Sequence, residues 1–165
     1  MGQVWVVGEV LIDLIREGVD RKPIVGGGPA NTAKALAKLG VDTQFIDGIS
    51  SDRYGQMANN ELLTAGAKLD YVKYSDKPTC LAIVSLSDSG SATYEFIIDS
   101  TATFDFTSEW LPNPETDRPL LLHIGTLATA IEPGASVLFE WAQSVAKVAP
   151  IVFDPNIRPA VISDR

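Results

Sequence analysis

The 165-residue sequence has little cysteine, little positive charge and no long apolar run. Its single cysteine, Cys80, excludes an internal disulfide, and we expect a buried thiol because the residue lies in a strand-like run. Lysines and arginines number 13 against 21 acidic residues, a formal net charge of −8, so no basic surface offsets the repulsion from nucleic-acid phosphates. No apolar stretch approaches the roughly 18 residues that a membrane span needs.

The beginning of the chain also lacks a targeting pattern. Val4–Val7 is a short continuous apolar run, typical of a strand buried on both faces, and it predicts that no signal peptide is present. An apolar content of 45% and a charged content of 21% are ordinary for a globular protein. We therefore expect a cytoplasmic protein of one domain, with or without a small appendage.

What the sequence does have is a run of three glycines, Gly26, Gly27 and Gly28, directly before a helical pattern. Glycine lets the backbone turn sharply and lets a small polar ligand approach its N–H groups. Pro29 suits the first turn of a helix, and Gly40 stands where helices commonly end. By itself, this run indicates either a ligand-binding loop or a tight turn between two elements.

Strands and helices alternate along much of the remaining chain. In order, the patterns predict a strand at 43–46, a helix at 54–65, a strand at 120–124, a helix at 133–148 and a strand at 151–153. This alternation predicts an α/β fold with a largely parallel sheet covered on both faces by helices. No helical pattern follows the last strand, so we expect a truncated sheet whose exposed edge aggregates or pairs with another chain.

The middle of the chain has a different pattern. Residues 79–86 and 92–98 alternate like strands and flank Ser87-Asp88-Ser89-Gly90, which is a hairpin signal. Together with extended residues near the glycine run, the hairpin predicts a small separate sheet, with strands around 13–25 and 72–100. Such a sheet would lie beside the glycine run and serve as a lid.

Polar residues at two places are candidates for binding. Asp13 follows an apolar run, and its carboxylate either accepts hydrogen bonds from adjacent sugar hydroxyls or caps the glycine loop. Asn156 and Arg158 follow the last strand, at the strand end where ligands collect in open parallel sheets. A guanidinium forks onto phosphate or carboxylate oxygens, but Asp-Pro-Asn before it is also good turn chemistry.

Other conspicuous residues have structural interpretations. His123 lies in a leucine-rich strand and is interpreted as a satisfied core residue rather than a catalyst. Asp52 is interpreted as a helix N-cap rather than a ligand. The apolar stripe of the helix at 133–148 has helical spacing and predicts core packing: Val137, Trp141, Val145 and Val148.

Three segments match a known family in the same order. They are Gly8-Glu9-Val10-Leu11-Ile12-Asp13, then Gly26-Gly27-Gly28-Pro29-Ala30-Asn31-Thr32-Ala33 with Gly40 after it, and Asp154-Pro155-Asn156-Ile157-Arg158. Their sequence and order resemble the ribokinase-like (PfkB) carbohydrate kinases, most of all the bacterial fructokinases among them. The resemblance spans residues 1–165 and implies the N-terminal half of a ribokinase-like α/β domain with a β-sheet lid.

The resemblance also implies roles for individual residues. Asp13 and Asn31 would bind sugar hydroxyls, while the backbone of Gly27 and Gly28 closes over the sugar ring. Asn156 and Arg158 would lie towards the transferred phosphate or an acidic group of the substrate. The implied reaction is attack of a sugar hydroxyl, with fructose as the expected sugar, on the γ-phosphate of MgATP. The implied assembly is a homodimer through the lid.

The sequence departs from the family pattern in two ways. Asp47 and Ser50 stand where the family usually has glycine, and Asp47 brings the local loop geometry into question. The family's second half carries a Gly-Ala-Gly-Asp motif that supplies an anion hole and a general base, whereas the last glycine here is Gly134. Phosphoryl transfer depends on such positioning and charge stabilisation, so we expect no catalytic residue, no metal ligand and no activity in this chain alone.

Two alternatives remain open at the level of the sequence. A 2-keto-3-deoxygluconate kinase would share the fold, and Arg158 would suit the carboxylate of that substrate. A truncated, non-catalytic module that binds sugar or dimerises through its lid would also fit these residues.

Overall fold

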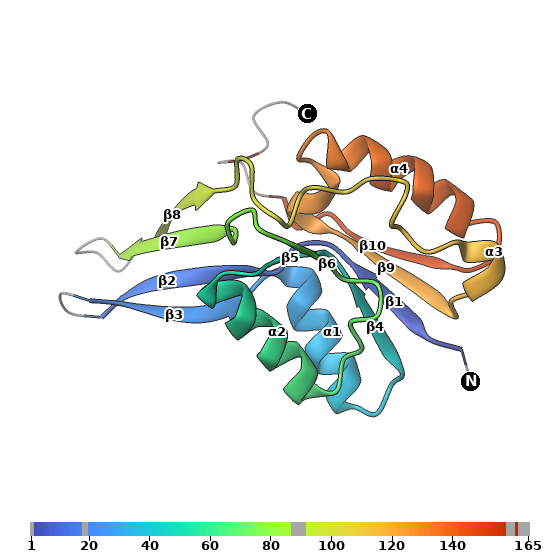
Figure 1. Ribbon diagram of the computed structural model, residues 1–165, viewed down its shortest axis with the longest axis horizontal. Coiled ribbons are helices and arrows are strands. Elements are labelled where there is room, and N and C mark those ends of the chain that lie inside the picture. The colour runs from blue at the N-terminus through green and yellow to red at the C-terminus, as the bar shows by residue number, and fades with distance from the viewer. Residues whose placement is uncertain (1, 18–19, 87–91, 158–160, 162–165) are drawn as a thin grey trace.

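A parallel sheet forms the centre of the computed structural model, which describes residues 2–17, 20–86, 92–157 and 161. Its four strands run in the order β10-β9-β1-β4 (Figure 1). They are β1 (Val4–Val7), β4 (Thr43–Ile46), β9 (Leu121–Gly125) and β10 (Ile151–Asp154). All three neighbouring pairs are parallel, which confirms the α/β class and the strands predicted for this sheet.

Helices cover both faces of the central sheet (Figure 1). α1 (Gly28–Lys38) and α2 (Arg53–Ala65) lie on one side and α4 (Gly134–Val145) lies on the other. Two short helical turns, α3 (Pro114–Asp117) and η1 (Thr126–Thr129), were not predicted. α4 ends earlier than predicted, before Pro150, and Val148 beyond it is exposed rather than part of the core.

The core divides into two layers because successive strand residues point to opposite faces of the sheet. Trp5 and Val7 of β1 pack on the α4 side, where the Trp5 ring stacks on Trp141 at a centroid distance of 5.8 Å. Val6 packs on the other side with the alanines of α1 and with α2. Cys80 is buried, as expected.

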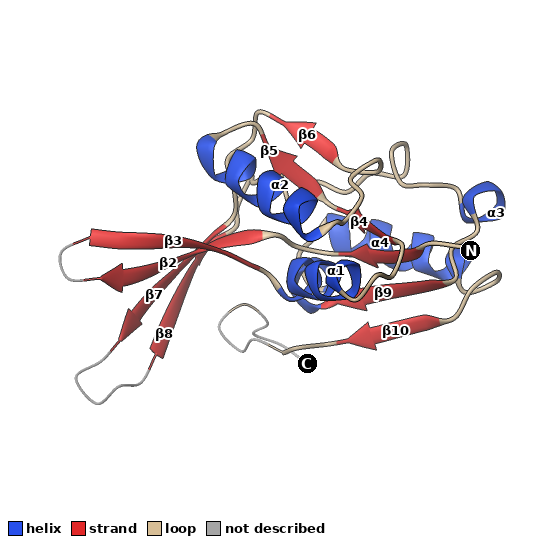
Figure 2. Ribbon diagram, turned by 90° about the horizontal axis from the view of Figure 1, so that it is seen from below, coloured by secondary structure: helices blue, strands red, loops and turns tan. Residues whose placement is uncertain are grey.

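A second sheet extends away from one end of this body (Figures 1 and 2). Its order is β3-β2-β7-β8, formed by β2 (Leu11–Glu17), β3 (Asp20–Gly26), β7 (Leu81–Leu86) and β8 (Ala92–Ile97). Two antiparallel pairs, β2 with β3 and β7 with β8, join through parallel pairing of β2 with β7. The predicted hairpin turn at 87–90 lies outside the described residues.

A small two-stranded sheet was missed from the sequence. It pairs β5 (Gly48–Ser50) with β6 (Lys73–Ser75). The segment near residue 72 therefore pairs with β5 rather than joining the second sheet, as the range 72–100 had suggested. β5 and β6 are only three residues long, too short to produce a periodic pattern.

β10 is an edge strand of the central sheet. Within the described ranges it pairs with β9 on one side and with no strand on the other. Its residues Val152 and Phe153 are 46% and 58% exposed, as expected for a sheet that lacks a cover here. No helix in the described part of the chain is long and apolar enough to cross a membrane.

Candidate functional site

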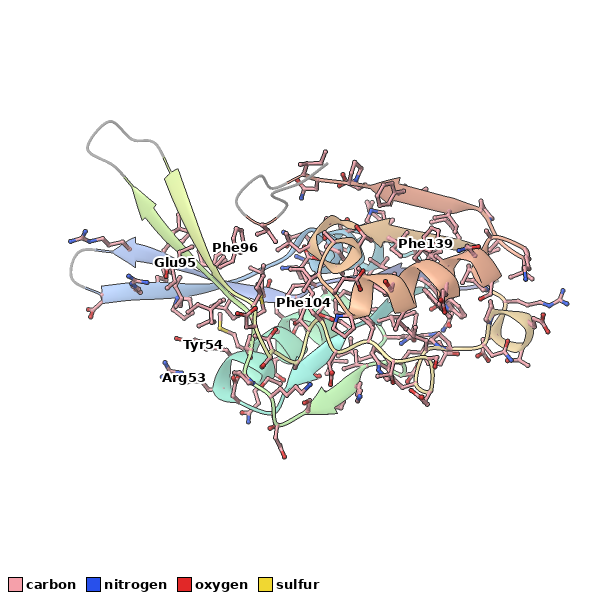
Figure 3. The ribbon with its side chains drawn as sticks, turned by 90° about the horizontal axis from the view of Figure 1, so that it is seen from above. Arg53, Tyr54, Glu95, Phe96, Phe104 and Phe139 are labelled. Carbon is pink, nitrogen blue, oxygen red and sulfur yellow. The ribbon has the colours of Figure 1, made fainter. Side chains whose placement is uncertain are left out.

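A cavity of about 630 Å³ lies where the second sheet meets the body. Its walls come from β2, the glycine run, β8, η1 and the segment after β10, and Figure 3 places Phe96 where β8 approaches the body. Five of the six candidate residues line this cavity: Asp13, Gly27, Gly28, Asn31 and Asn156. The sixth, Arg158, lies outside the described residues.

The glycine run brings backbone into contact with backbone. Gly27 has a φ of 103°, and a Cβ at this position would collide with the carbonyl oxygen of Glu9. The Asn31 amide donates to the Gly27 carbonyl at 2.9 Å, which begins α1 directly after the run. Glycine at 27 is therefore required both for its conformation and for this close approach.

Asp13 has no partner for its carboxylate among the described residues. It lies in β2 opposite Ile24 of β3, is half-buried, and faces the cavity. Burial raises the pKa of this carboxyl group above its usual value. The alternative role as a cap of the glycine loop has no hydrogen bond to support it, so the carboxylate is available to a ligand.

Two side-chain amides from distant parts of the sequence lie near the glycine run. Asn31 is exposed in the first turn of α1. Asn156 follows β10 with a φ of 35°, and its backbone N–H donates to Oδ1 of Asp154 at 3.1 Å. Nδ2 of Asn156 lies 3.5 Å from the position that a Cβ on Gly28 would occupy. The sequence therefore identified side chains that the fold brings together.

Glu9 is a buried carboxylate in the cavity wall that sequence reasoning did not identify as a site residue. It is 3% exposed, and its Oε2 accepts hydrogen bonds from Oγ1 of Thr126 and from the Ala128 amide at 3.2 Å. Burial raises its pKa, although these hydrogen bonds act in the opposite direction. The sequence did hold a signal for this residue, because Glu9 is an acidic residue within an otherwise apolar segment.

The loop at Asp47, whose geometry the sequence left in question, is held by hydrogen bonds to the Asp47 carboxylate. Asp47 is fully buried, and its carboxylate accepts from the amides of Val10 and Gly48, both at 2.8 Å. Thr103 donates from Oγ1 to the Val10 carbonyl at 3.0 Å. Burial raises the pKa of Asp47 well above its usual value. Asp47 thus fixes the segment between the two sheets instead of distorting it.

Asp52 and His123 lie outside the cavity wall. Asp52 caps α2, accepting from the amides of Tyr54 and Gly55 at 2.9 and 2.8 Å, which confirms its predicted role. His123 is half-buried, but its Nδ1 is buried without a partner among the described residues; the expectation of a satisfied histidine was wrong. Burial lowers the pKa of His123.

The charge of the cavity favours a neutral ligand. Glu9 and Asp13 line it, and none of its described lining residues is a lysine or arginine. Carboxylates repel phosphate groups but accept hydrogen bonds from hydroxyls. In the described ranges, no three His, Cys, Asp or Glu side chains gather closely enough to hold a metal ion.

The chain resembles proteins of known activity over its whole length. Residues 1–165 match the profile described as pfkB family carbohydrate kinase. The chain is 32% identical to a fructokinase of Escherichia coli over 165 residues, covering 98% of this chain and 53% of that protein. It spans about half the length of the curated relatives it matches.

Solved structures agree in fold. A fructokinase from Xylella fastidiosa with bound ATP superposes with a TM-score of 0.87 at 28% identity, covering 96% of this chain and 53% of that one. A fructokinase from Vibrio cholerae with bound fructose, ADP and calcium superposes with a TM-score of 0.82 at 25% identity, covering 98% and 53%. The chain therefore has the fold of these proteins over about half of their length.

Proposed function

Because the chain belongs to the pfkB family of carbohydrate kinases, we propose that it is the N-terminal, sugar-binding half of an ATP-dependent fructokinase. The complete enzyme would transfer the γ-phosphate of MgATP to a hydroxyl of fructose. The relatives named fructokinase, and the structure that holds fructose and ADP, support this choice of sugar and nucleotide.

The observation that carries the proposal is the carboxylate of Asp13, which has no partner among the described residues and lies in a cavity whose described wall has no cation. A polyol suits this environment, since adjacent hydroxyls can donate to the two carboxylate oxygens. Asn31 supplies an amide that donates to or accepts from further hydroxyls. Ile15 and Phe96 add an apolar wall for the carbon face of the sugar.

In this proposal, phosphate and metal bind mainly outside the described residues. Glu9 and Asp13 lie beside the glycine run and would repel a phosphate there. Phosphoryl transfer needs a phosphate cradle and a correctly placed base, and the described residues of the cavity wall supply neither. We therefore assign the ATP and Mg²⁺ sites to residues beyond this chain, with Asn156 and Arg158 directed towards the transferred phosphate.

The second sheet is proposed to serve as a lid over the sugar and as the contact of a homodimer. It covers one side of the cavity through Asp13 and Phe96. Ile24 and Ile97, on its two edge strands β3 and β8, are exposed apolar side chains that a partner sheet would bury. We also place the protein in the cytoplasm.

Calorimetry on the purified 165-residue chain tests sugar binding. Fructose should bind to the wild type and at least tenfold more weakly to Asp13→Asn, because one hydroxyl acceptor is lost. Asp20→Asn, an equal change at an exposed position of β3, should bind as the wild type does. Absence of fructose binding would contradict the proposal, and tighter binding of 2-keto-3-deoxygluconate would favour that alternative substrate.

An ATP-consumption assay with the same chain and fructose tests the assignment to half an enzyme. We expect binding of fructose without turnover. Clear turnover that Asp13→Asn abolishes would overturn the claim that catalysis requires residues outside this chain.

A further inference from the structure

The segment between the two sheets carries a buried carboxylate to which the proposed reaction assigns no role. Residues 8–10 connect β1 of the body to β2 of the second sheet, and Glu9 is the middle residue of this linker. Its side chain is 3% exposed and forms part of the cavity wall. Burying a carboxylate is costly unless it is hydrogen-bonded, so its partners indicate its role.

Those partners are both in η1, the turn that follows β9. Oε2 of Glu9 accepts hydrogen bonds from Oγ1 of Thr126 and from the amide of Ala128, the latter at 3.2 Å. More than a hundred residues separate Glu9 from this turn (a separation of 117 to Thr126). The carboxylate therefore links the segment before the second sheet to η1, whose Thr126 and Leu127 also line the cavity.

Thr126 extends this connection to the glycine run. Its φ is 62°, a conformation that β-branched residues rarely adopt without support. Its Oγ1 points to Glu9, while its Cγ2 lies 2.9 Å from the position that a Cβ on Gly28 would occupy. Because one χ1 angle places both groups, the hydrogen bond to Glu9 also fixes the methyl group against Gly28.

We propose that Glu9 is a positioning residue of the sugar site, which acts through Thr126 to fix η1 against Gly28 and the adjacent Asn156. This inference rests on the proposed function, since the site it shapes is the one assigned to the sugar. Glu9 does not need to touch the sugar in this role. What it must supply is an oxygen that accepts from Thr126 and Ala128, with or without a charge.

Pairs of variants separate this role from others. Thr126→Val keeps the shape but loses the donor, and Glu9→Ala loses the acceptor; each should weaken fructose binding about tenfold, as expected for one hydrogen bond to a carboxylate. Thr126→Ser keeps the donor and Glu9→Gln keeps an accepting oxygen, so both should bind within about threefold of wild type. If Glu9→Ala does not fold, the Thr126 pair decides the question.

Thr103→Val is the matched control for loss of stability. Thr103 is buried and donates to the Val10 carbonyl of the same linker, but it does not line the cavity. This variant should lower the melting temperature as Thr126→Val does and leave fructose affinity unchanged. Equal weakening of affinity by Thr103→Val and Thr126→Val would overturn the positioning role, because general loosening would then explain both.

The remaining outcomes are also decisive. Wild-type affinity in Thr126→Val overturns the inference, and a Glu9→Gln variant as weak as Glu9→Ala means that the charge itself is required, which also overturns it. If the wild type binds no sugar, the proposed function fails on its own. The amide NMR signals of Gly28 and Asn156 then decide: shifts in Thr126→Val but not in Thr103→Val support the inference, and unchanged signals overturn it.

Discussion

Gly26 and Asp13 lie on neighbouring strands so close together that a Cβ on Gly26 would overlap Oδ2 of Asp13. Gly26 pairs with Leu11 in an extended strand, where any residue type fits the backbone. Glycine at this position therefore leaves the space that the Asp13 carboxylate occupies. The first glycine of the run leaves space for the carboxylate of Asp13, whereas the second, Gly27, adopts the positive φ that the turn needs.

Gly26→Ala is predicted to displace the Asp13 carboxylate and to weaken fructose binding about tenfold, comparable to the loss of one charged hydrogen bond. Gly40→Ala is the control. Gly40 has a φ of 82° and no atom within 4 Å of an added Cβ, so this change should cost about 1 kcal/mol of stability without altering affinity. Calorimetry and urea unfolding measure the two effects, and equal affinities in Gly26→Ala and wild type would refute the prediction.

Asp52→Ala is predicted to lower the free energy of unfolding by about 2 kcal/mol, the upper end for loss of an N-cap. The carboxylate of Asp52 caps α2 and also accepts from the amide and hydroxyl of Thr79, at 2.9 and 2.6 Å. Asn113→Ala removes the cap of the four-residue α3, which is more exposed, and should cost about 0.5 kcal/mol. Urea unfolding distinguishes them; a larger cost for Asn113→Ala would contradict this ranking.

Asp52 should stabilise the protein less as the pH falls. Burial alone would raise its pKa, but hydrogen bonds from Thr79 and Gly55 outweigh burial and lower it. A lowered pKa means that the stabilisation is present above the unfolded-state value, near 4, and is lost as the carboxylate becomes protonated below it. The difference in unfolding free energy between wild type and Asp52→Asn should therefore shrink between pH 6 and pH 3. A difference that grows on acidification would contradict the argument.

Asp47 should show the opposite dependence. Burial raises its pKa in the folded state, so its contribution to stability is greatest below the unfolded-state pKa, near 4, and decreases as the pH rises through the folded-state value. The stability difference between wild type and Asp47→Asn should grow as the pH is lowered from 8 to 4. Urea unfolding across this range measures it, and a difference independent of pH would show that Asp47 has the same pKa in both states.

Residues with a local pattern were predictable from the sequence, and those defined by distant contacts were not. The boundaries of α2 followed from Asp52 and Gly66, which stand at its two ends. Asp13 and Asn156 were found because each follows a strand-like run. Glu9 was missed as a site residue because its hydrogen-bond partner Thr126 lies far away in sequence, and no spacing rule relates the two.

The edge strand β10 is predicted to make the isolated chain self-associate. Phe153→Lys places a charge on this edge and should shift the chain towards smaller species, down to the proposed dimer, in sedimentation velocity, since charged residues protect sheet edges from pairing. Phe139→Lys is the control, because Phe139 is 68% exposed but lies on α4 (Figure 3). An equal shift in both variants would mean that general charge, and not the strand edge, controls association.

The pairing of β2 with β7 imposes an order on folding. The hairpins β2–β3 and β7–β8 each join neighbouring segments. The pairing of Ile12 with Leu81, in contrast, closes a long loop of chain that contains α1 and α2. Closing so long a loop is slow compared with forming a hairpin. The pairing of β2 with β7 should therefore form after the two hairpins, and the amides that join these two strands should gain protection after the hairpin amides in a pulsed hydrogen-exchange experiment.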